Sequence, residues 1–165
     1  MVRLLPTPWA ALLVAFAAVL EVAVAPYLTL GYAAPRFMII GIVFAAAGLR
    51  DLQGILVGFF GGVLTDALGG GLFGTHALAG LVAAFLAVRS GVGFRKYNTR
   101  LTLVFVVMLA VAAFDIIGIT ALNLSGYGSV PVGRFMVVGV MPDVLLNGLL
   151  AYLFCRVMER FGLIG

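Results

Sequence analysis

The sequence predicts an all-α integral membrane protein, a compact bundle of six transmembrane helices in one domain over residues 1–165. Of its 165 residues, 64% are hydrophobic and 10% are charged, and the mean hydropathy is +1.25. Soluble domains are roughly 45–50% apolar and 25% charged. A spanning helix needs about 20 residues, so the chain has room for about six spans and for no soluble domain beside them. The composition therefore excludes a soluble enzyme and a nucleic-acid-binding module.

The first apolar run, residues 9–30, follows Arg3 and contains Ala23-Val24-Ala25, which looks like the cleavage site of a signal peptide. Pro26 comes directly after this site and argues against cleavage. We expect an uncleaved first helix that is bent near Pro26.

The second run, residues 37–49, is the weakest candidate. Thirteen residues cover only about 20 Å of a hydrocarbon core of about 30 Å. A bundle of five spans with this segment re-entrant is therefore an alternative to six spans. The remaining runs are separated by polar or Gly- and Pro-containing breaks and cover residues 52–68, 72–88, 101–124 and 135–157.

Basic residues are distributed unequally between the two sides of this bundle. With six spans and a cytoplasmic N-terminus, eight lie inside: Arg3, Arg50, Arg89, Arg95, Lys96, Arg100, Arg156 and Arg160. Two lie outside, Arg36 and Arg134. This agrees with the positive-inside rule, although five spans fit the same count. Both arrangements place the C-terminus in the cytoplasm and make the loop 89–100 a topology anchor against anionic lipid, and six spans also place the N-terminus there.

Carboxyl groups within apolar runs are the main departure from an inert bundle, because charge at membrane depth is costly. Four share the outer half of the membrane: Glu21, Asp66, Asp115 and Asp143. They suggest a path for protons or cations, or a pocket for a cationic solute. Alternatively, they are protonated or pair with polar neighbours and so determine which helices meet; the available neighbours are Arg36, Arg134, His76 and Asn147. We favour this structural interpretation, because the inner halves offer no acceptors to continue a path.

Glycines line one side of the third run, where Gly54, Gly58 and Gly62 recur every four residues beside Gly61. Such a face lets helix backbones approach closely in lipid. Packing within the chain is favoured over packing against a partner helix.

Motifs for catalysis or for cofactor and metal binding are lacking in the sequence. There is no Ser/His/Asp arrangement, no HExxH and no cysteine nucleophile with a base. Cys155 is the one cysteine, His76 is the one histidine, and we interpret Gly69–Gly71 as a turn. The sequence thus predicts a protein without enzymatic activity.

One stretch resembles the central signature of the rod shape-determining protein MreD family. It reads Gly58-Phe59-x-x-Gly62-x-Leu64-x-Asp66, followed by Gly69–Gly71, Leu72-x-Gly74 and Ala77-Leu78. Three further features are similar to that family and follow in order along nearly the whole chain: Pro35 before a short segment, Asp115–Ile117, and Asn147–Leu149 ahead of Arg156 and Arg160.

This resemblance implies a scaffold of the bacterial cytoplasmic (inner) membrane that serves the cell-elongation machinery and peptidoglycan synthesis. Its implied partner is the transmembrane helix of MreC, with indirect links to MreB, RodA and a class B penicillin-binding protein. The candidate structural or partner-binding residues are Gly54, Gly58, Phe59, Gly62, Asp66, Gly74, Asp115, Asp143 and Asn147.

Two alternatives remain open. The family is also thought to look like the substrate-binding S component of energy-coupling-factor transporters, which would make the chain a vitamin-binding protein. The carboxyl groups would suit a small proton-coupled transporter.

Overall fold

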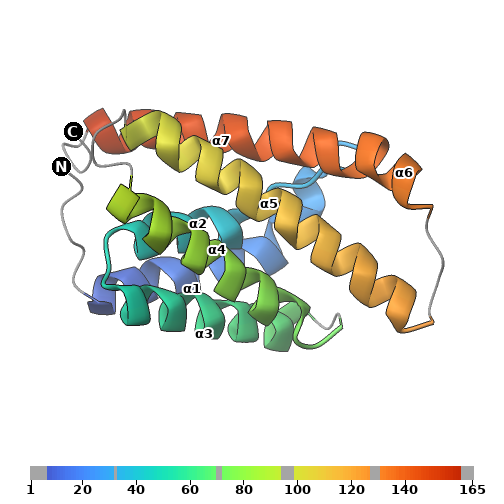
Figure 1. Ribbon diagram of the computed structural model, residues 1–165, viewed down its shortest axis with the longest axis horizontal. Helices are drawn as coiled ribbons and strands as arrows, with labels where there is room; N and C mark the ends of the chain where they lie inside the picture. The colour runs from blue at the N-terminus through green and yellow to red at the C-terminus, as the bar shows by residue number, and fades with distance from the viewer. Residues whose placement is uncertain (1–6, 32, 70–71, 94–98, 127–130, 161–165) are drawn as a thin grey trace.

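The computed structural model describes residues 7–31, 33–69, 72–93, 99–126 and 131–160. Six principal helices appear in this part of the chain (Figure 1): α1 (Thr7–Ala23), α2 (Phe37–Ala47), α3 (Asp51–Gly69), α4 (Thr75–Gly93), α5 (Thr99–Leu124) and α7 (Met141–Arg160). Three short elements accompany them: the 3₁₀ helix η1 (Ala25–Leu28), α6 (Val132–Phe135) and the π-helical turn η2 (Met136–Val140).

Three of the described helices are long and apolar enough to cross a membrane, namely Asp51–Gly69, Arg100–Leu124 and Met136–Arg160. Three shorter apolar helices are Pro8–Ala23, Phe37–Ala47 and Thr75–Ser90. The predicted all-helical class is confirmed, while the number of spans stays a prediction.

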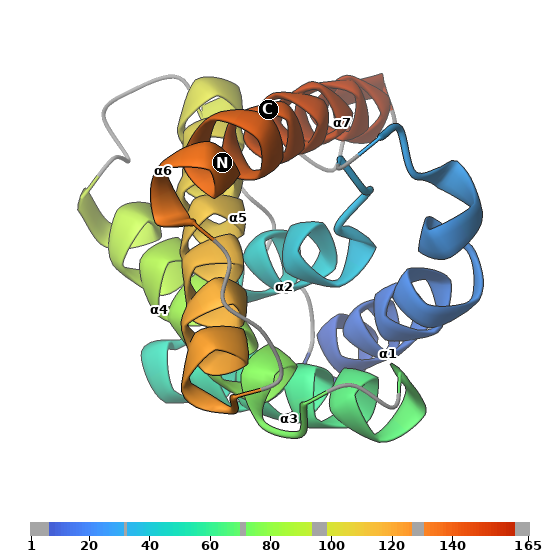
Figure 2. The ribbon, with the colours of Figure 1, turned by 90° about the vertical axis from the view of Figure 1, so that its right-hand side faces the viewer.

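The short helix α2 forms the centre of the bundle. Its sequence is apolar all round, and nine of its eleven residues are buried, as expected for a helix without a polar face. Viewed along the bundle, α1, α3, α4, α5 and α7 surround it (Figure 2). Successive members of this ring pack together, but α1 and α7 do not pack against each other in the part of the chain described. The ring is therefore open on one side, where α2 forms the floor.

The first and last helices have different limits from those predicted. The first helix ends at Ala23, and Pro26 lies in the separate turn η1 and not in a bent helix. The last run starts earlier, at Val132, and passes through η2 before α7. Pro142 explains this turn: it has no N–H to give to the carbonyl four residues before it, so the backbone widens and Met141 N–H donates to the carbonyl of Met136.

The glycine face of α3 packs inside the chain. A Cβ at Gly58 would clash with Ala84 and with the carbonyl of Gly80, and one at Gly54 would lie 2.6 Å from Val88 Cγ2, all on α4. Gly61 faces Val14 of α1 in the same way. These missing side chains let α3 lie directly against two neighbours.

Candidate functional site: a polar layer and an apolar groove

The N-terminus of α2 lies within the bundle and needs partners for its free N–H groups. At about 1.5 Å per residue, eleven residues span only about 16 Å, roughly half of a hydrocarbon core. Side chains of α7 and α1 accept these hydrogens: Ala34 N–H donates to Asp143 Oδ1 (2.6 Å), Arg36 N–H to Asn147 Oδ1 (2.7 Å) and Met38 N–H to Glu21 Oε2 (3.2 Å). A buried N–H group without an acceptor is costly, so each of these bonds satisfies a group that would otherwise be unpaired.

Asn147 also binds the segment before α2 as a hydrogen-bond donor. Its amide nitrogen donates to the carbonyls of Ala34 and Asp143, both at 2.9 Å, and the side chain is fully buried. Helix α7 is thereby attached to the segment that leads into α2, and it also meets α2 itself where the rings of Phe154 and Phe44 pack edge to face, 4.9 Å apart.

The guanidinium of Arg36 sits between two carboxylates. Its Nε donates to Asp143 Oδ2 at 2.9 Å, its Nη2 lies 2.8 Å from the same oxygen, and Nη2 donates to Asp115 Oδ1 at 3.5 Å. Its Cζ lies 4.6 Å from the centre of the Phe114 ring, a cation–π distance. Asp143 uses both oxygens, whereas Oδ2 of Asp115 is buried without a hydrogen-bond partner among the described residues.

Asp66 closes a second polar cluster at the start of α4. Its carboxylate accepts the N–H groups of Gly74 (2.9 Å), His76 (3.1 Å) and Ala77 (3.0 Å), and it lies 2.9 Å from His76 Nδ1. Gly74 has φ +97°, a conformation that other residues rarely adopt, and so permits the tight turn. A carboxylate at this place satisfies the helix N-terminus and complements its dipole.

Phe114 connects the two clusters, because its ring meets the His76 ring at 5.2 Å and the guanidinium of Arg36, which directly precedes α2. We call the combined set the polar layer; its members are Glu21, Arg36, Asp66, His76, Phe114, Asp115, Asp143 and Asn147. Every carboxylate in it accepts a hydrogen bond or pairs with a charged side chain of another helix or turn. The arrangement caps and joins helices, and the described residues contain no His, Cys, Asp and Glu group able to hold a metal ion.

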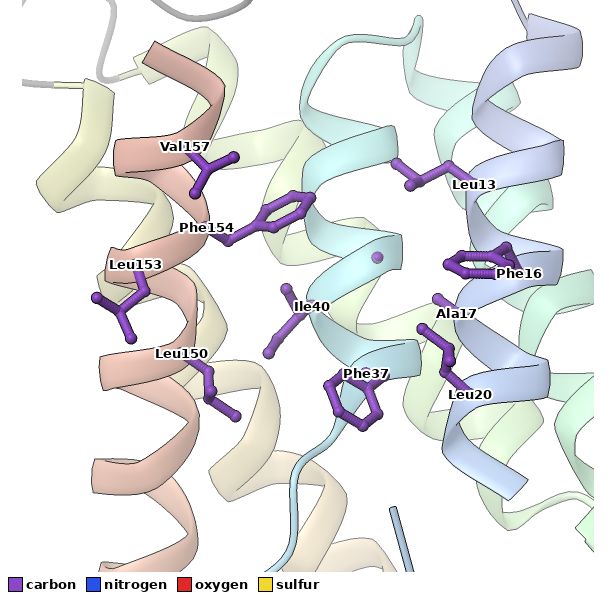
Figure 3. Close-up of a pocket in the computed structure, with 11 residues that line it drawn as sticks. Leu13, Phe16, Ala17, Leu20, Phe37, Ile40, Leu150, Leu153, Phe154 and Val157 are labelled. Carbon is purple, nitrogen blue, oxygen red and sulfur yellow. The ribbon is translucent and has the colours of Figure 1, made fainter. Parts of the chain in front are cut away.

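An apolar groove opens between α1 and α7, on the open side of the ring. It has a volume of about 340 Å³, and its lining comprises Leu13, Phe16, Ala17, Leu20, Phe37, Ile40, Gly41, Leu150, Leu153, Phe154 and Val157. Figure 3 shows Phe154 pointing from α7 towards α2, with Leu13 and Leu20 facing it from α1. None of the described residues that line the groove has a polar side chain, and Leu20 and Phe37 at one end adjoin the polar layer through Glu21 and Arg36.

The structure separates the predicted site residues into three places. Asp115, Asp143, Asn147 and Arg36 come together, and Asp66 and Gly74 form the turn before α4. Gly54, Gly58 and Gly62 lie at the contact between α3 and α4. Phe59 lies apart from these three places and is exposed on α3.

The basic residues predicted to set topology are only partly described. Arg89 is exposed near the end of α4, and Arg100 forms an ion pair with Glu159 and lies 5.5 Å from the Tyr152 ring. Arg95 and Lys96, the side chain of Arg134, and Gly70 and Gly71 lie outside the described residues. Sequence reasoning missed Glu159 and Phe114; the isolated acid at an otherwise basic end was the available signal for Glu159.

Taken together, the central apolar helix, the long apolar helices and the capped polar layer define a polytopic membrane protein. A family model described as rod shape-determining protein MreD matches residues 1–162. The chain belongs to the MreD family, and its role is in rod shape determination. No curated protein and no solved structure matches the chain, so the expected likeness to transporter S components stays a prediction.

Proposed function

We propose that this chain is a non-enzymatic membrane scaffold of the bacterial cell-elongation complex, and that the groove between α1 and α7 receives the transmembrane helix of MreC. Its family supplies the role in rod shape. The observation that carries the proposal is the groove itself, an apolar opening in an otherwise continuous ring of helices. MreB, RodA and a class B penicillin-binding protein would be linked indirectly, through MreC.

Shape is the reason why a groove favours helix binding in lipid. Apolar side chains gain little by leaving acyl chains for one another, so helices associate where their surfaces fit closely. The groove offers walls on two helices and a floor that includes the small residues Ala17 and Gly41. A helix seated there would contact α1, α2 and α7 at once.

The polar layer gives this groove a fixed geometry. Asp143 and Asn147 hold α7 to the segment before α2, and Glu21 holds α1 to the first turn of α2. Both walls are thus attached to the floor at one end. The carboxyl groups serve the partner site by positioning its walls and have no contact with the partner.

The charge distribution supports an orientation with both termini in the cytoplasm. Four exposed arginines lie at the end of the bundle where α3 begins and where α4 and α7 end (Figure 1): Arg50, Arg89, Arg156 and Arg160. An excess of arginine marks the cytoplasmic side of a membrane protein. The polar layer then lies towards the outer side of the cytoplasmic membrane.

Filling the groove tests the proposal. Leu150→Trp and Leu13→Trp place an indole ring in the groove from opposite walls. Leu149→Trp makes the same change at the adjacent position, which is 57% exposed and lies outside the groove. We expect both groove variants to lose co-purification of MreC from native membranes and to make rod-shaped cells round. The Leu149→Trp control should keep both properties.

Two outcomes would contradict this function. If the groove variants fold and retain MreC, the partner helix binds elsewhere. If the purified protein carries no MreC but is stabilised against heat by a water-soluble vitamin, the S-component alternative is correct.

A further inference from the structure

We propose that the same groove, before a partner helix enters, holds one acyl chain of an anionic phospholipid from the cytoplasmic leaflet, with the lipid phosphate on Arg160. The assignment to this leaflet rests on the orientation given under the proposed function. The binding of a lipid tail in the groove and of its phosphate on Arg160 does not depend on whether MreC binds.

The groove, together with the face of α1 that leads to it from Trp9, matches the depth of one leaflet. Its lining extends from Leu13 to Leu20 on α1 and from Val157 to Leu150 on α7, a rise of about 10 Å on each helix. From Trp9, at the start of the same face of α1, to Leu20 is about 16 Å. Half of a hydrocarbon core of about 30 Å is about 15 Å. A lipid tail entering from the arginine-rich end would fill the slot and stop at the polar layer.

The mouth of the groove has the residues that favour lipid headgroups. Trp9 lies four residues before Leu13, and Arg160 lies seven residues after Leu153, so each continues a groove wall by one or two helical turns. Trp9 is 64% exposed, and Arg160 is exposed. Tryptophan is enriched at the membrane interface, and basic residues at the cytoplasmic ends of helices bind anionic headgroups.

Arg160 is available for phosphate, because the acid next to it in the sequence pairs with another arginine. Glu159 is engaged by Arg100 of α5, which bonds both of its carboxylate oxygens. The mouth of the groove therefore combines an exposed cation with an apolar slot that leads away from it. This combination distinguishes a bound lipid from the general lipid layer, which contacts side chains such as Leu149 without a slot.

Native mass spectrometry of the purified full-length chain with added phosphatidylglycerol or phosphatidylcholine tests the proposal. We expect the first phosphatidylglycerol to bind about fivefold more tightly than phosphatidylcholine, as one basic residue beside a headgroup of net negative charge provides, because choline neutralises the phosphate of phosphatidylcholine. Arg160→Gln should remove this preference, and Arg89→Gln, which removes an exposed arginine of α4, should not. Leu150→Trp should weaken binding of both lipids, and Leu149→Trp should leave it unchanged.

Equal binding of the two lipids by the original chain would overturn the headgroup assignment, and so would an equal loss in Arg89→Gln. Unchanged binding in a folded Leu150→Trp protein would show surrounding lipid only and overturn the slot. Arg160→Gln is expected to keep MreC co-purification. If the original chain co-purifies with MreC but shows no preference for phosphatidylglycerol, only this inference is refuted. If it shows the lipid preference but does not co-purify with MreC, only the proposed partner is refuted.

Discussion

Gly62→Ala is expected to weaken the contact between α3 and α4. An added Cβ would clash with the carbonyl oxygen of His76 and lie 2.5 Å from its carbonyl carbon and 2.6 Å from Ala77 Cα. Real Cβ atoms essentially never approach within 3.0 Å, and all three neighbours are backbone atoms that no rotamer change can move. The two helices must separate, and overpacking of this kind costs about 1–3 kcal/mol in the free energy of unfolding.

Gly118→Ala is the matched control, because the same substitution in α5 meets nothing within 4 Å. Alanine in a helix interior is favoured over glycine by about 0.5–1 kcal/mol, so this variant should be slightly more stable than the original chain. The two variants should then differ by about 1.5–4 kcal/mol, in opposite directions from the original.

Unfolding of the purified protein in mixed micelles, followed as the fraction of sodium dodecyl sulfate rises, measures this difference. Helix content reports the folded state, and each midpoint shift gives the change in stability. If Gly62→Ala proves as stable as Gly118→Ala, the close approach of α3 and α4 is wrong, and so is the role of the glycine face in internal packing.

The same assay tests three carboxyl groups of the polar layer. Asp143→Ala should cost about 3–5 kcal/mol, because it leaves the Arg36 guanidinium without its closest partner; a loss below about 1 kcal/mol would refute this pairing. Asp115→Asn should change stability by at most about 1 kcal/mol, since an amide oxygen still accepts from Arg36 and the second carboxylate oxygen has no described partner; a collapse of the fold would contradict this. Asp66→Ala should cost about 2 kcal/mol or more, since three N–H groups lose their acceptor, and retention of full stability would refute the capping role.

The main features of the bundle were predictable because they depend on composition and local pattern. The six apolar runs, the glycine spacing at Gly54, Gly58 and Gly62, and the expensive carboxyl groups are all visible in the sequence. The pairing of Arg36 with Asp143 was among the expected possibilities, but no pattern distinguished it from pairing through Arg134. The choice depends on which helices are neighbours, and 107 residues separate the two partners.

The limits of the helices were harder to predict where the chain leaves a helix inside the bundle. The sequence predicts that residues 24–30 continue the first span, yet the helix ends at Ala23 and the chain returns to start α2 at Phe37. Local propensity cannot show this, because the segment before α2 is stabilised by Asp143 and Asn147 on α7. The turn η2 is different, since Pro142 lies next to it in the sequence and explains it locally.

By itself, the sequence determined that this protein belongs in a membrane, that its few charges are divided into a basic end and buried acids, and that helix α3 has a smooth face. These properties follow from transfer energies and helical periodicity, which act over short stretches of chain. Only the tertiary structure decided that the shortest of the six principal helices lies at the centre, that distant carboxylates cap its N-terminus, and that α1 and α7 leave a groove open between them. The physical reason is that unsatisfied backbone groups and unfilled space arise only when helices distant in sequence are packed together.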